Sequence, residues 1–268
     1  MRIALCNEVL APLPFARQCE VAAALGYDGL EIAPFTLGDA APATLRRAAA
    51  DAGIEVSGLH WLLRQPAGLS ITSADTAVRA RTLDTMRHQI DLCADLGGAV
   101  LVHGSPAQRR LPPGEEAAAR ERGIEAFAAV AAHAQAAGVV YCIEPLAAPE
   151  ADFIHTVAEA AAIVRAIGRP ALRTMLDCCA AARAEAEPVP AVLARWLPTG
   201  LLAHVQVNDP NLRGPGQGAL AFADILRTLR QHRYAGWVAV EPFDYQPDGP
   251  MAAARAIGYL RGLLEALD

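Results

Sequence analysis

The chain has 268 residues, of which 53% are hydrophobic and 19% are charged, and its formal net charge is −6. These values are typical of a globular protein with a large core, and the acidic balance argues against a surface that coats nucleic acid, which would normally be basic. No apolar run approaches the roughly 18 residues that a membrane span requires, and the N-terminal residues show no signal-peptide pattern. We therefore expect a cytoplasmic protein without nucleic-acid or membrane partners.

Strand-like and helix-like patterns alternate along the chain. The predicted strands cover residues 2–7, 29–34, 55–61, 99–105, 139–145, 172–178, 201–209 and 236–242. The predicted helices cover residues 14–25, 43–52, 74–96, 114–137, 155–167, 188–197, 222–232 and 250–266. Ser73, just before the third of these helices, is the expected N-cap.

Strands that alternate with helices form parallel βαβ units, and eight such units are the number that closes a TIM barrel. We therefore predict an α/β fold, with residues 1–268 forming a single (β/α)8 TIM-barrel domain. The alternative is a doubly wound open sheet, whose first turn often carries a Gly-rich phosphate loop. The first turn here reads NEVLAPLP, without such a loop. The Pro/Gly-rich segments 104–114 and 208–218 follow strands and should border the active-site face of a barrel.

The absence of lysine excludes some chemistry, because all 23 basic residues other than histidine are arginine. Arginine stays protonated and cannot form an imine, so a Schiff-base aldolase and an enzyme that binds pyridoxal phosphate through its own lysine are excluded. The six cysteines form no C-x-x-C pair, and several lie in apolar runs, so we expect them to be reduced and buried.

Two apolar runs, VVYCIEPL and WVAVEPF, each end in a glutamate that precedes a proline, namely Glu144 and Glu241. Asp177 ends the sixth predicted strand, and Gln206 lies on the seventh. In a barrel, the C-terminal ends of the strands meet at the active site, where three carboxylates would repel one another unless a cation lay between them. An oxygen-rich set suits one divalent cation, Mg²⁺ or Mn²⁺. The alternative is that each acid is a separate helix cap or salt bridge.

Three histidines lie on predicted strands. His60 and His103 end the third and fourth strands and are expected to face the mouth and contact a substrate, with structural hydrogen bonding as the alternative. His204 lies two residues before Gln206 on the same face, so we expect it one layer deeper, supporting the metal site rather than binding the ion.

The fragments IEPL, LD, HVQVND and VEPF, on the last four predicted strands, resemble the sugar phosphate isomerase/epimerase family. This family of xylose isomerase-like TIM barrels includes ketose 3-epimerases and hydroxypyruvate isomerase. The resemblance implies a Glu-Asp-His-Glu metal set at Glu144, Asp177, Gln206 and Glu241, with the two glutamates as the catalytic acid/base pair. It extends along the whole chain, through SGLHWLL, LVHGSPAQR, NDPNLRGPGQGAL and YAGWVAVEPFDY.

The resemblance also implies substrate contacts, and it has two departures. Glu150 matches a glutamate that contacts the sugar, and Arg213 lies within one residue of the family's substrate arginine. Gln206 stands where the family has a histidine ligand, so we expect metal binding to persist with lower affinity, because an amide oxygen is a weaker donor than imidazole. Ala180 stands where the family has a substrate-contacting histidine, which puts the usual preference for free ketoses in doubt.

The predicted function is isomerisation or epimerisation of a small ketose or related hydroxy-carbonyl compound. One glutamate would remove a proton to give an enediolate. Return of a proton by the other glutamate gives an epimer, whereas return to the neighbouring carbon gives an aldose–ketose isomer. The alternatives are a metal-dependent dehydratase or lyase and a non-catalytic sugar-binding protein. A xylose isomerase proper is disfavoured because its site includes a lysine, and an abasic-site endonuclease because the chain is acidic. The sequence is compatible with a homo-oligomer.

Overall fold

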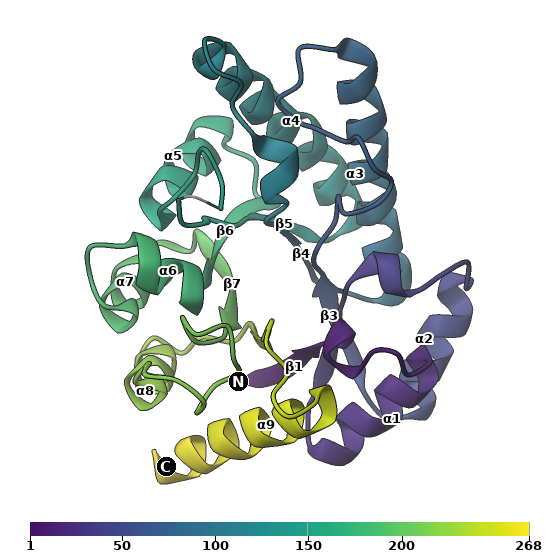
Figure 1. The fold of residues 1–268 in the computed structure, drawn as a ribbon, viewed down its shortest axis with the longest axis vertical. Coiled ribbons are helices and arrows are strands. Elements are labelled where there is room, and N and C mark those ends of the chain that lie inside the picture. The colour runs from purple at the N-terminus through teal and green to yellow at the C-terminus, as the bar shows by residue number, and fades with distance from the viewer. Residues whose placement is uncertain (149, 268) are drawn as a thin grey trace.

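The structure is a computed structural model, and it describes residues 1–148 and 150–267. Eight parallel strands close into one barrel in sequence order, and pairing of the first with the last completes the ring (Figure 1). The strands are β1 (Arg2–Cys6), β2 (Gly29–Ile32), β3 (Glu55–Leu59), β4 (Val100–His103), β5 (Val140–Ile143), β6 (Leu172–Asp177), β7 (Leu202–Val207) and β8 (Trp237–Val240). The predicted TIM barrel is therefore confirmed, and the open-sheet alternative is excluded because the sheet closes on itself.

Helices surround the strands and cover the outside of the barrel (Figure 1). They are α1 (Phe15–Leu25), α2 (Pro42–Asp51), α3 (Thr76–Leu96), α4 (Glu116–Ala137), α5 (Val157–Ile167), α6 (Cys178–Ala184), α7 (Val189–Trp196), α8 (Phe222–Gln231) and α9 (Gly249–Ala266). Short 3-10 segments follow β1, β2, β4 and α7, namely η1 (Asn7–Leu10), η2 (Pro34–Thr36), η3 (Pro106–Arg109) and η4 (Leu197–Thr199).

The sequence pattern missed one helix, α6, which starts directly after β6. Asp177, the last residue of β6, accepts a hydrogen bond from the backbone N–H of Ala180 at 2.7 Å and thereby caps α6. Helix α3 begins later than predicted, and its cap is Asp75 rather than Ser73. The Ser73 hydroxyl instead accepts a hydrogen bond from the N–H of Asp75 at 3.1 Å, in the turn before the helix.

The strands are buried on both sides, because one face lines the barrel interior and the other packs against helices. Every residue of β2, β4 and β8 is buried. The main hydrophobic cluster joins strand residues to helix residues such as Phe127, Phe222 and Leu260. All six cysteines are free and buried, as their positions in apolar runs predicted. Among the residues that the structure describes, no helix is long and apolar enough to cross a membrane.

Candidate active site at the barrel mouth

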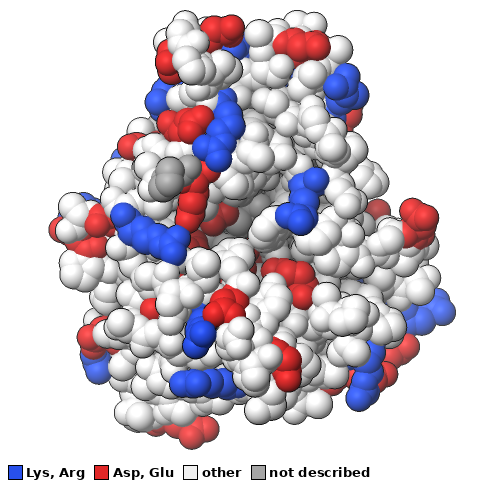
Figure 2. All heavy atoms as spheres, in the orientation of Figure 1, with Lys and Arg blue, Asp and Glu red and all other residues white. Residues whose placement is uncertain are grey.

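A cavity of about 830 Å³ opens at one end of the barrel, a volume typical of a small-molecule site. Figure 2 shows the molecule hollowed on this face, with acidic and basic side chains around the hollow. Several lining residues directly follow the C-terminal ends of strands: His60 follows β3, Gly104 follows β4, Glu144 follows β5, and Glu241 follows β8. The cavity is therefore on the face where the sequence analysis expected the active site.

Three carboxylates meet at the floor of this cavity. Glu144, Asp177 and Glu241 each offer an oxygen, and these oxygens all lie within 4.8 Å of one another. The three residues are only 8%, 5% and 5% exposed. The structure thus brings together the three acids that the ends of β5, β6 and β8 were predicted to carry.

Burial and mutual repulsion oppose the ionisation of these carboxyl groups. Burial, reinforced by the charge of Asp177, raises the pKa of Glu144 to about 8. Burial also raises the pKa of Asp177 to about 6, although the backbone N–H of Ala180 stabilises its charged form. The pKa of Glu241 lies well above its usual range, because burial and the charges of Glu144 and Asp177 outweigh the attraction of His60. Bound protons or a bound cation are therefore favoured over three bare carboxylates.

Backbone contacts to neighbouring segments hold the two glutamates in place. The N–H of Glu144 donates to the carbonyl of His103 at 3.2 Å, and its own carbonyl accepts from Nη1 of the fully buried Arg109 at 2.8 Å. The carbonyl of Glu241 accepts from the side-chain amide of Asn208 at 3.1 Å. These bonds fix the directions in which both carboxylates leave the chain.

Gly104 leaves the space that the Glu144 carboxylate occupies. A Cβ atom at residue 104 would lie 2.2 Å from Oε2 of Glu144, far inside contact distance. Because the end of a flexible side chain can move aside, we expect Gly104→Ala to change stability little but to displace the carboxylate. A displacement of about 1 Å can cost about 100-fold in rate, so turnover should fall by about that factor.

Turnover and thermal unfolding of Gly104→Ala, compared with those of Gly258→Ala, test this prediction. Gly258 lies in α9, and a Cβ atom added there meets no neighbour within 4 Å, so its variant should keep wild-type turnover. Wild-type turnover in Gly104→Ala as well would show that the reaction does not depend on where the Glu144 carboxylate lies.

Gln206 lies on β7 between the strands that carry Asp177 and Glu241, and its side chain is fully buried. Its Nε2 donates to Oε1 of Glu31, on β2, at 2.7 Å. Oε2 of Glu31 lies 2.7 Å from Nε2 of His204, so two polar side chains of β7 share one carboxylate. His204 is not part of the group of three carboxylates.

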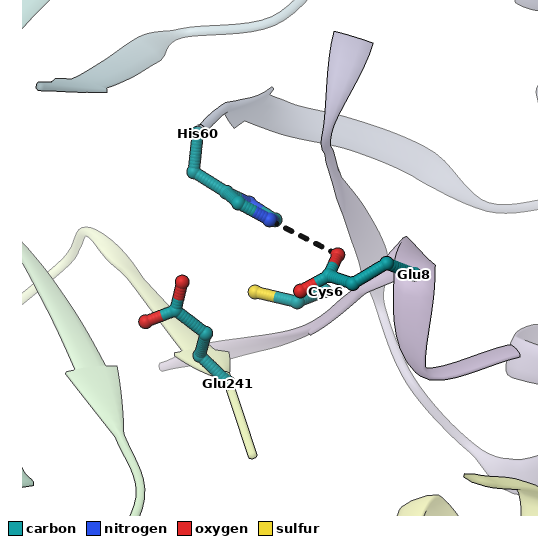
Figure 3. A group of neighbouring side chains, drawn as sticks. All are labelled: Cys6, Glu8, His60 and Glu241. Atoms are coloured by element: carbon teal, nitrogen blue, oxygen red, sulfur yellow. Dashed lines mark hydrogen bonds and ion pairs between the residues drawn. The ribbon is translucent and has the colours of Figure 1, made fainter. Parts of the chain in front are cut away.

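A second group of polar side chains, Cys6, Glu8, His60 and Glu241, adjoins the three carboxylates, and Figure 3 shows these side chains directed toward one another. Nε2 of His60 lies 3.0 Å from Oε2 of Glu8, and Nδ1 lies 3.3 Å from Oε1 of Glu31. Burial favours the neutral ring of His60, but the charges and hydrogen bonds of these carboxylates outweigh it and raise its pKa well above the usual value. The acidic neighbours of His60 therefore favour its protonated form.

The substrate contacts that the resemblance implied are divided between the cavity and its surroundings. Glu150 lines the cavity, and its Oε1 accepts from Nη1 of Arg183, on α6, at 2.7 Å. Arg213 does not line the cavity. Its Nε donates to Oδ2 of Asp244 at 2.9 Å, and Asp244 does not line the cavity either. Leu212, the residue before Arg213, contributes to the lining instead.

His103 points away from the cavity, which corrects the expectation that it faces the mouth. Its Nδ1 lies 2.7 Å from the hydroxyl of Tyr141, and its ring packs edge-on against Phe127 of α4 at a centroid distance of 5.0 Å. Burial, together with the charge of Arg109, lowers the pKa of His103 to about 3, so the ring is neutral. His103 is a core histidine in a structural hydrogen bond, which was the alternative to substrate contact in the sequence analysis.

An aromatic rim borders the cavity outside the buried acids. Trp61 packs against Phe35 and Phe243 at centroid distances of 6.1 and 6.3 Å, and the guanidinium of Arg64 lies 4.9 Å from the ring of Trp61. Phe243 is 43% exposed, so the rim is the outer part of the site. Trp61 and Leu212 have positive φ angles of 54° and 69°, which are costly for residues other than glycine and cluster at functional sites.

The charged residues of this region that the sequence analysis missed include Glu8, Glu31 and Arg109. Glu31 lies in the predicted strand GLEIAP, where an acid among apolar residues is costly to bury without a partner. The reasoning that found Glu144 would therefore have found Glu31 too. Glu8 directly follows the first predicted strand, which is a weaker signal, and Arg109 lies in a Pro/Gly-rich segment that gave none.

Comparison with known proteins gives consistent matches. Residues 19–263 match the family described as "Xylose isomerase-like TIM barrel". A D-psicose 3-epimerase of Agrobacterium fabrum is 31% identical over 243 residues, which cover 85% of this chain and 79% of that protein. An L-ribulose 3-epimerase of Mesorhizobium japonicum is 28% identical over 222 residues, which cover 81% and 72%. A solved structure of an L-ribulose 3-epimerase matches with a TM-score of 0.87 over 99% of this chain and 95% of that chain, at 24% identity.

The family match covers most of the chain, and the relatives that share its sequence are enzymes named as epimerases. The closed barrel and its mouth cavity agree with this assignment. The chain is therefore an enzyme of the xylose isomerase-like TIM barrel family, in its epimerase and isomerase class.

Proposed function

We propose that the chain, as one barrel domain, is an epimerase of a small ketose that depends on one divalent cation, Mn²⁺ or Mg²⁺. The observation that carries this proposal is the group of buried carboxylates of Glu144, Asp177 and Glu241 at the floor of the cavity. The names of the relatives, D-psicose and L-ribulose 3-epimerase, support a ketose over other hydroxy-carbonyl compounds.

The three carboxylates at the cavity floor, together with Gln206 on the strand beside Asp177, fit a hard cation. Among the residues that the structure describes, Oδ2 of Asp177 and Oε1 of Gln206 are buried without a hydrogen-bond partner, whereas buried polar atoms normally have one. Together with the carboxylates of Glu144 and Glu241 they make an oxygen-only set, which suits Mg²⁺ or Mn²⁺, and these four residues would hold the ion. When bound, the cation would polarise the substrate carbonyl and acidify the neighbouring C–H group.

Glu144 and Glu241 are the proposed acid/base pair. They leave different strands, β5 and β8, and reach the cavity floor from separate positions on the ring. One removes the proton from the carbon beside the carbonyl, giving an enediolate, and the other returns a proton from the opposite face, which inverts that carbon. Their burial keeps bulk water from the transferred proton.

His60 and Glu150 are the proposed contacts to substrate hydroxyl groups, because both line the cavity. Arg183 holds Oε1 of Glu150 at 2.7 Å and leaves its other oxygen for the substrate. Both ring nitrogens of His60 already face carboxylates, Nε2 that of Glu8 at 3.0 Å and Nδ1 that of Glu31 at 3.3 Å, so a substrate hydroxyl would share one of these ring N–H groups. The ring of Trp61, on the rim, would cover the apolar side of the sugar carbon chain.

Solvent-deuterium exchange with a panel of ketoses tests this function. We expect the substrate to gain deuterium at the inverted carbon and to form its epimer only when Mn²⁺ or Mg²⁺ is present. Formation of an aldose would indicate an isomerase instead, and loss of water would indicate a dehydratase. No exchange with any ketose, in protein shown to contain the metal, would contradict the proposal.

Gln206→His is expected to tighten binding of Mn²⁺ and Zn²⁺, because imidazole is a stronger donor to transition ions than an amide oxygen. We expect a gain of roughly tenfold, which corresponds to about 1.4 kcal/mol, in calorimetric titration of the metal-free protein. Gln89→His is the matched control, since Gln89 is a largely buried glutamine on α3, away from the cavity floor. Unchanged or weaker affinity in Gln206→His would mean that Gln206 is not a ligand, and His204 would become the candidate.

A further inference from the structure

Glu31 is a buried carboxylate in the barrel interior that the proposed reaction does not use. It lies on β2 and is 0% exposed. Its Oε1 accepts from Nε2 of Gln206 at 2.7 Å and lies 3.3 Å from Nδ1 of His60, whereas Oε2 lies 2.7 Å from Nε2 of His204. Burying a carboxylate is costly even with good partners, so packing alone does not account for it.

The bond to Glu31 determines which end of the Gln206 amide points away from β2. An ionised carboxylate can only accept hydrogen bonds, so it takes the NH₂ end of the amide. Oε1 of Gln206 is then directed away from Glu31, and among the described residues it is buried without a hydrogen-bond partner. Gln206 pairs in the sheet with Asp177. It therefore lies on the strand next to the one that carries this carboxylate.

The two histidines keep Glu31 in the form that this orientation requires. Nε2 of His204 lies 2.7 Å from Oε2 of Glu31, and Nδ1 of His60 lies 3.3 Å from Oε1, so ring N–H groups can donate to both oxygens of the ionised carboxylate. A neutral carboxyl group could donate as well as accept, and it would no longer select one orientation of the amide.

We propose that Glu31 is a positioning residue, which holds the NH₂ end of Gln206 and thereby presents the amide oxygen as a ligand to the cation. This inference rests on the proposed cation site. The proposal assigns a function to Glu31, which lies outside the three-carboxylate group. It also explains how Gln206, an uncharged side chain, can act as a metal ligand beside three acids. Glu31 thus tunes the affinity of the site without touching the ion or the substrate.

Calorimetric titration with Mn²⁺ tests the inference, because it does not depend on turnover. Glu31→Gln is expected to weaken Mn²⁺ binding by about 10- to 100-fold, the usual cost of removing a group that orients a metal ligand. In a Gln206→Ala background the same substitution should change the affinity by less than about twofold, since no amide remains to be oriented. Equal losses in the two backgrounds would overturn the proposal.

An exchange of the two side chains gives a sharper test. Glu31→Gln combined with Gln206→Glu keeps one amide and one carboxylate in contact, with the carboxylate now on β7. We expect this double variant to bind Mn²⁺ at least as tightly as the wild type and more tightly than Gln206→Glu alone, in which two buried carboxylates repel each other and the hydrogen bond is lost. Because the exchange retains the hydrogen bond, it decides the question even if Glu31→Gln alone does not fold. An exchange variant as weak as either single variant would overturn the proposal.

Ser57→Ala is the matched control for a buried polar residue of the barrel. Ser57 lies on β3, is 0% exposed, and donates its hydroxyl to the carbonyl of Leu30 at 3.0 Å, so its variant should keep wild-type Mn²⁺ affinity. Wild-type protein that binds no Mn²⁺ would contradict the cation of the proposed function. Wild-type protein that binds Mn²⁺ no better than Glu31→Gln would contradict only the role of Glu31.

Discussion

Glu144→Gln and Glu241→Gln are each expected to lower the rate of epimerisation by about 10²- to 10⁴-fold, the usual cost of losing a general base. The free energy of unfolding of the metal-free protein should rise or stay unchanged. The pKa of both carboxyl groups is raised in the fold, so their charges destabilise the metal-free protein, and a neutral amide of the same size relieves that repulsion. Loss of activity with unchanged or higher thermal stability would separate catalysis from folding.

Proton exchange should distinguish the two glutamates. If each acts on one face of the substrate carbon, the glutamate that remains can still remove and return a proton on its own face. Deuterium should therefore enter the epimer whose proton faces that glutamate, without inversion. We expect Glu144→Gln and Glu241→Gln to retain this exchange from opposite epimers, which requires each variant to be assayed from both.

The assay has to be made at saturating Mn²⁺, because both glutamates are also proposed ligands. Glu121→Gln, at an exposed position on α4, is the matched control and should keep wild-type turnover. Near wild-type rates in both variants, on a substrate that the wild type converts, would mean that neither glutamate is the base. The two Glu-Pro strand ends would then serve only to hold the cation.

The barrel and the three acids of its floor could be predicted because both follow from local patterns. Alternating strands and helices predict parallel βαβ units, and an acid at the end of an apolar strand needs a partner. The face of a strand that is buried on both sides could not be predicted in the same way. β4 is buried along its whole length, so the pattern did not show that His103 faces Phe127 rather than the cavity.

Contacts between residues far apart in the chain account for the rest. Gln206 donates to Glu31, which is 175 residues away, and nothing in either segment predicts that pair. The position of Arg213 depends on an ion pair with Asp244, 31 residues on, between two irregular segments. Helix α6 was missed because it is short and starts at Asp177 itself, whose side chain both caps the helix and faces the cavity.

Asp177→Asn is expected to remove most Mn²⁺ binding while leaving both proposed bases in place. Oδ1 of Asp177 accepts from the N–H of Ala180, and asparagine can keep that cap, so the fold should persist. The variant loses a negative charge next to the ion, and a pair of unit charges about 4 Å apart is worth about 4 kcal/mol at an effective dielectric constant of about 20. We expect affinity to fall on the order of 100- to 1,000-fold.

Elemental analysis after loading with Mn²⁺ measures this loss, and Asp209→Asn is its matched control. Asp209 is 2% exposed, follows β7, and accepts hydrogen bonds from the N–H groups of Ala219 and Leu220, but it does not line the cavity. The control should keep its metal. If the wild type and Asp177→Asn bind the same amount of Mn²⁺, the assignment of the cation site is wrong.

The same carboxylates give the metal-free protein a characteristic response to pH. In the fold, the pKa is about 6 for Asp177 and about 8 for Glu144, whereas both groups titrate near about 4 in an unfolded chain. The folded state therefore binds more protons than the unfolded state across this window, and stability falls as the pH rises from about 4 to about 8.

Bound Mn²⁺ takes the place of those protons, so the unfolding temperature should decline from pH 5 to pH 8 in a chelator but stay nearly level with excess Mn²⁺. Asp177→Asn should show a shallower decline in the chelator. The same slope with and without Mn²⁺ in the wild type would contradict a cation among these carboxylates.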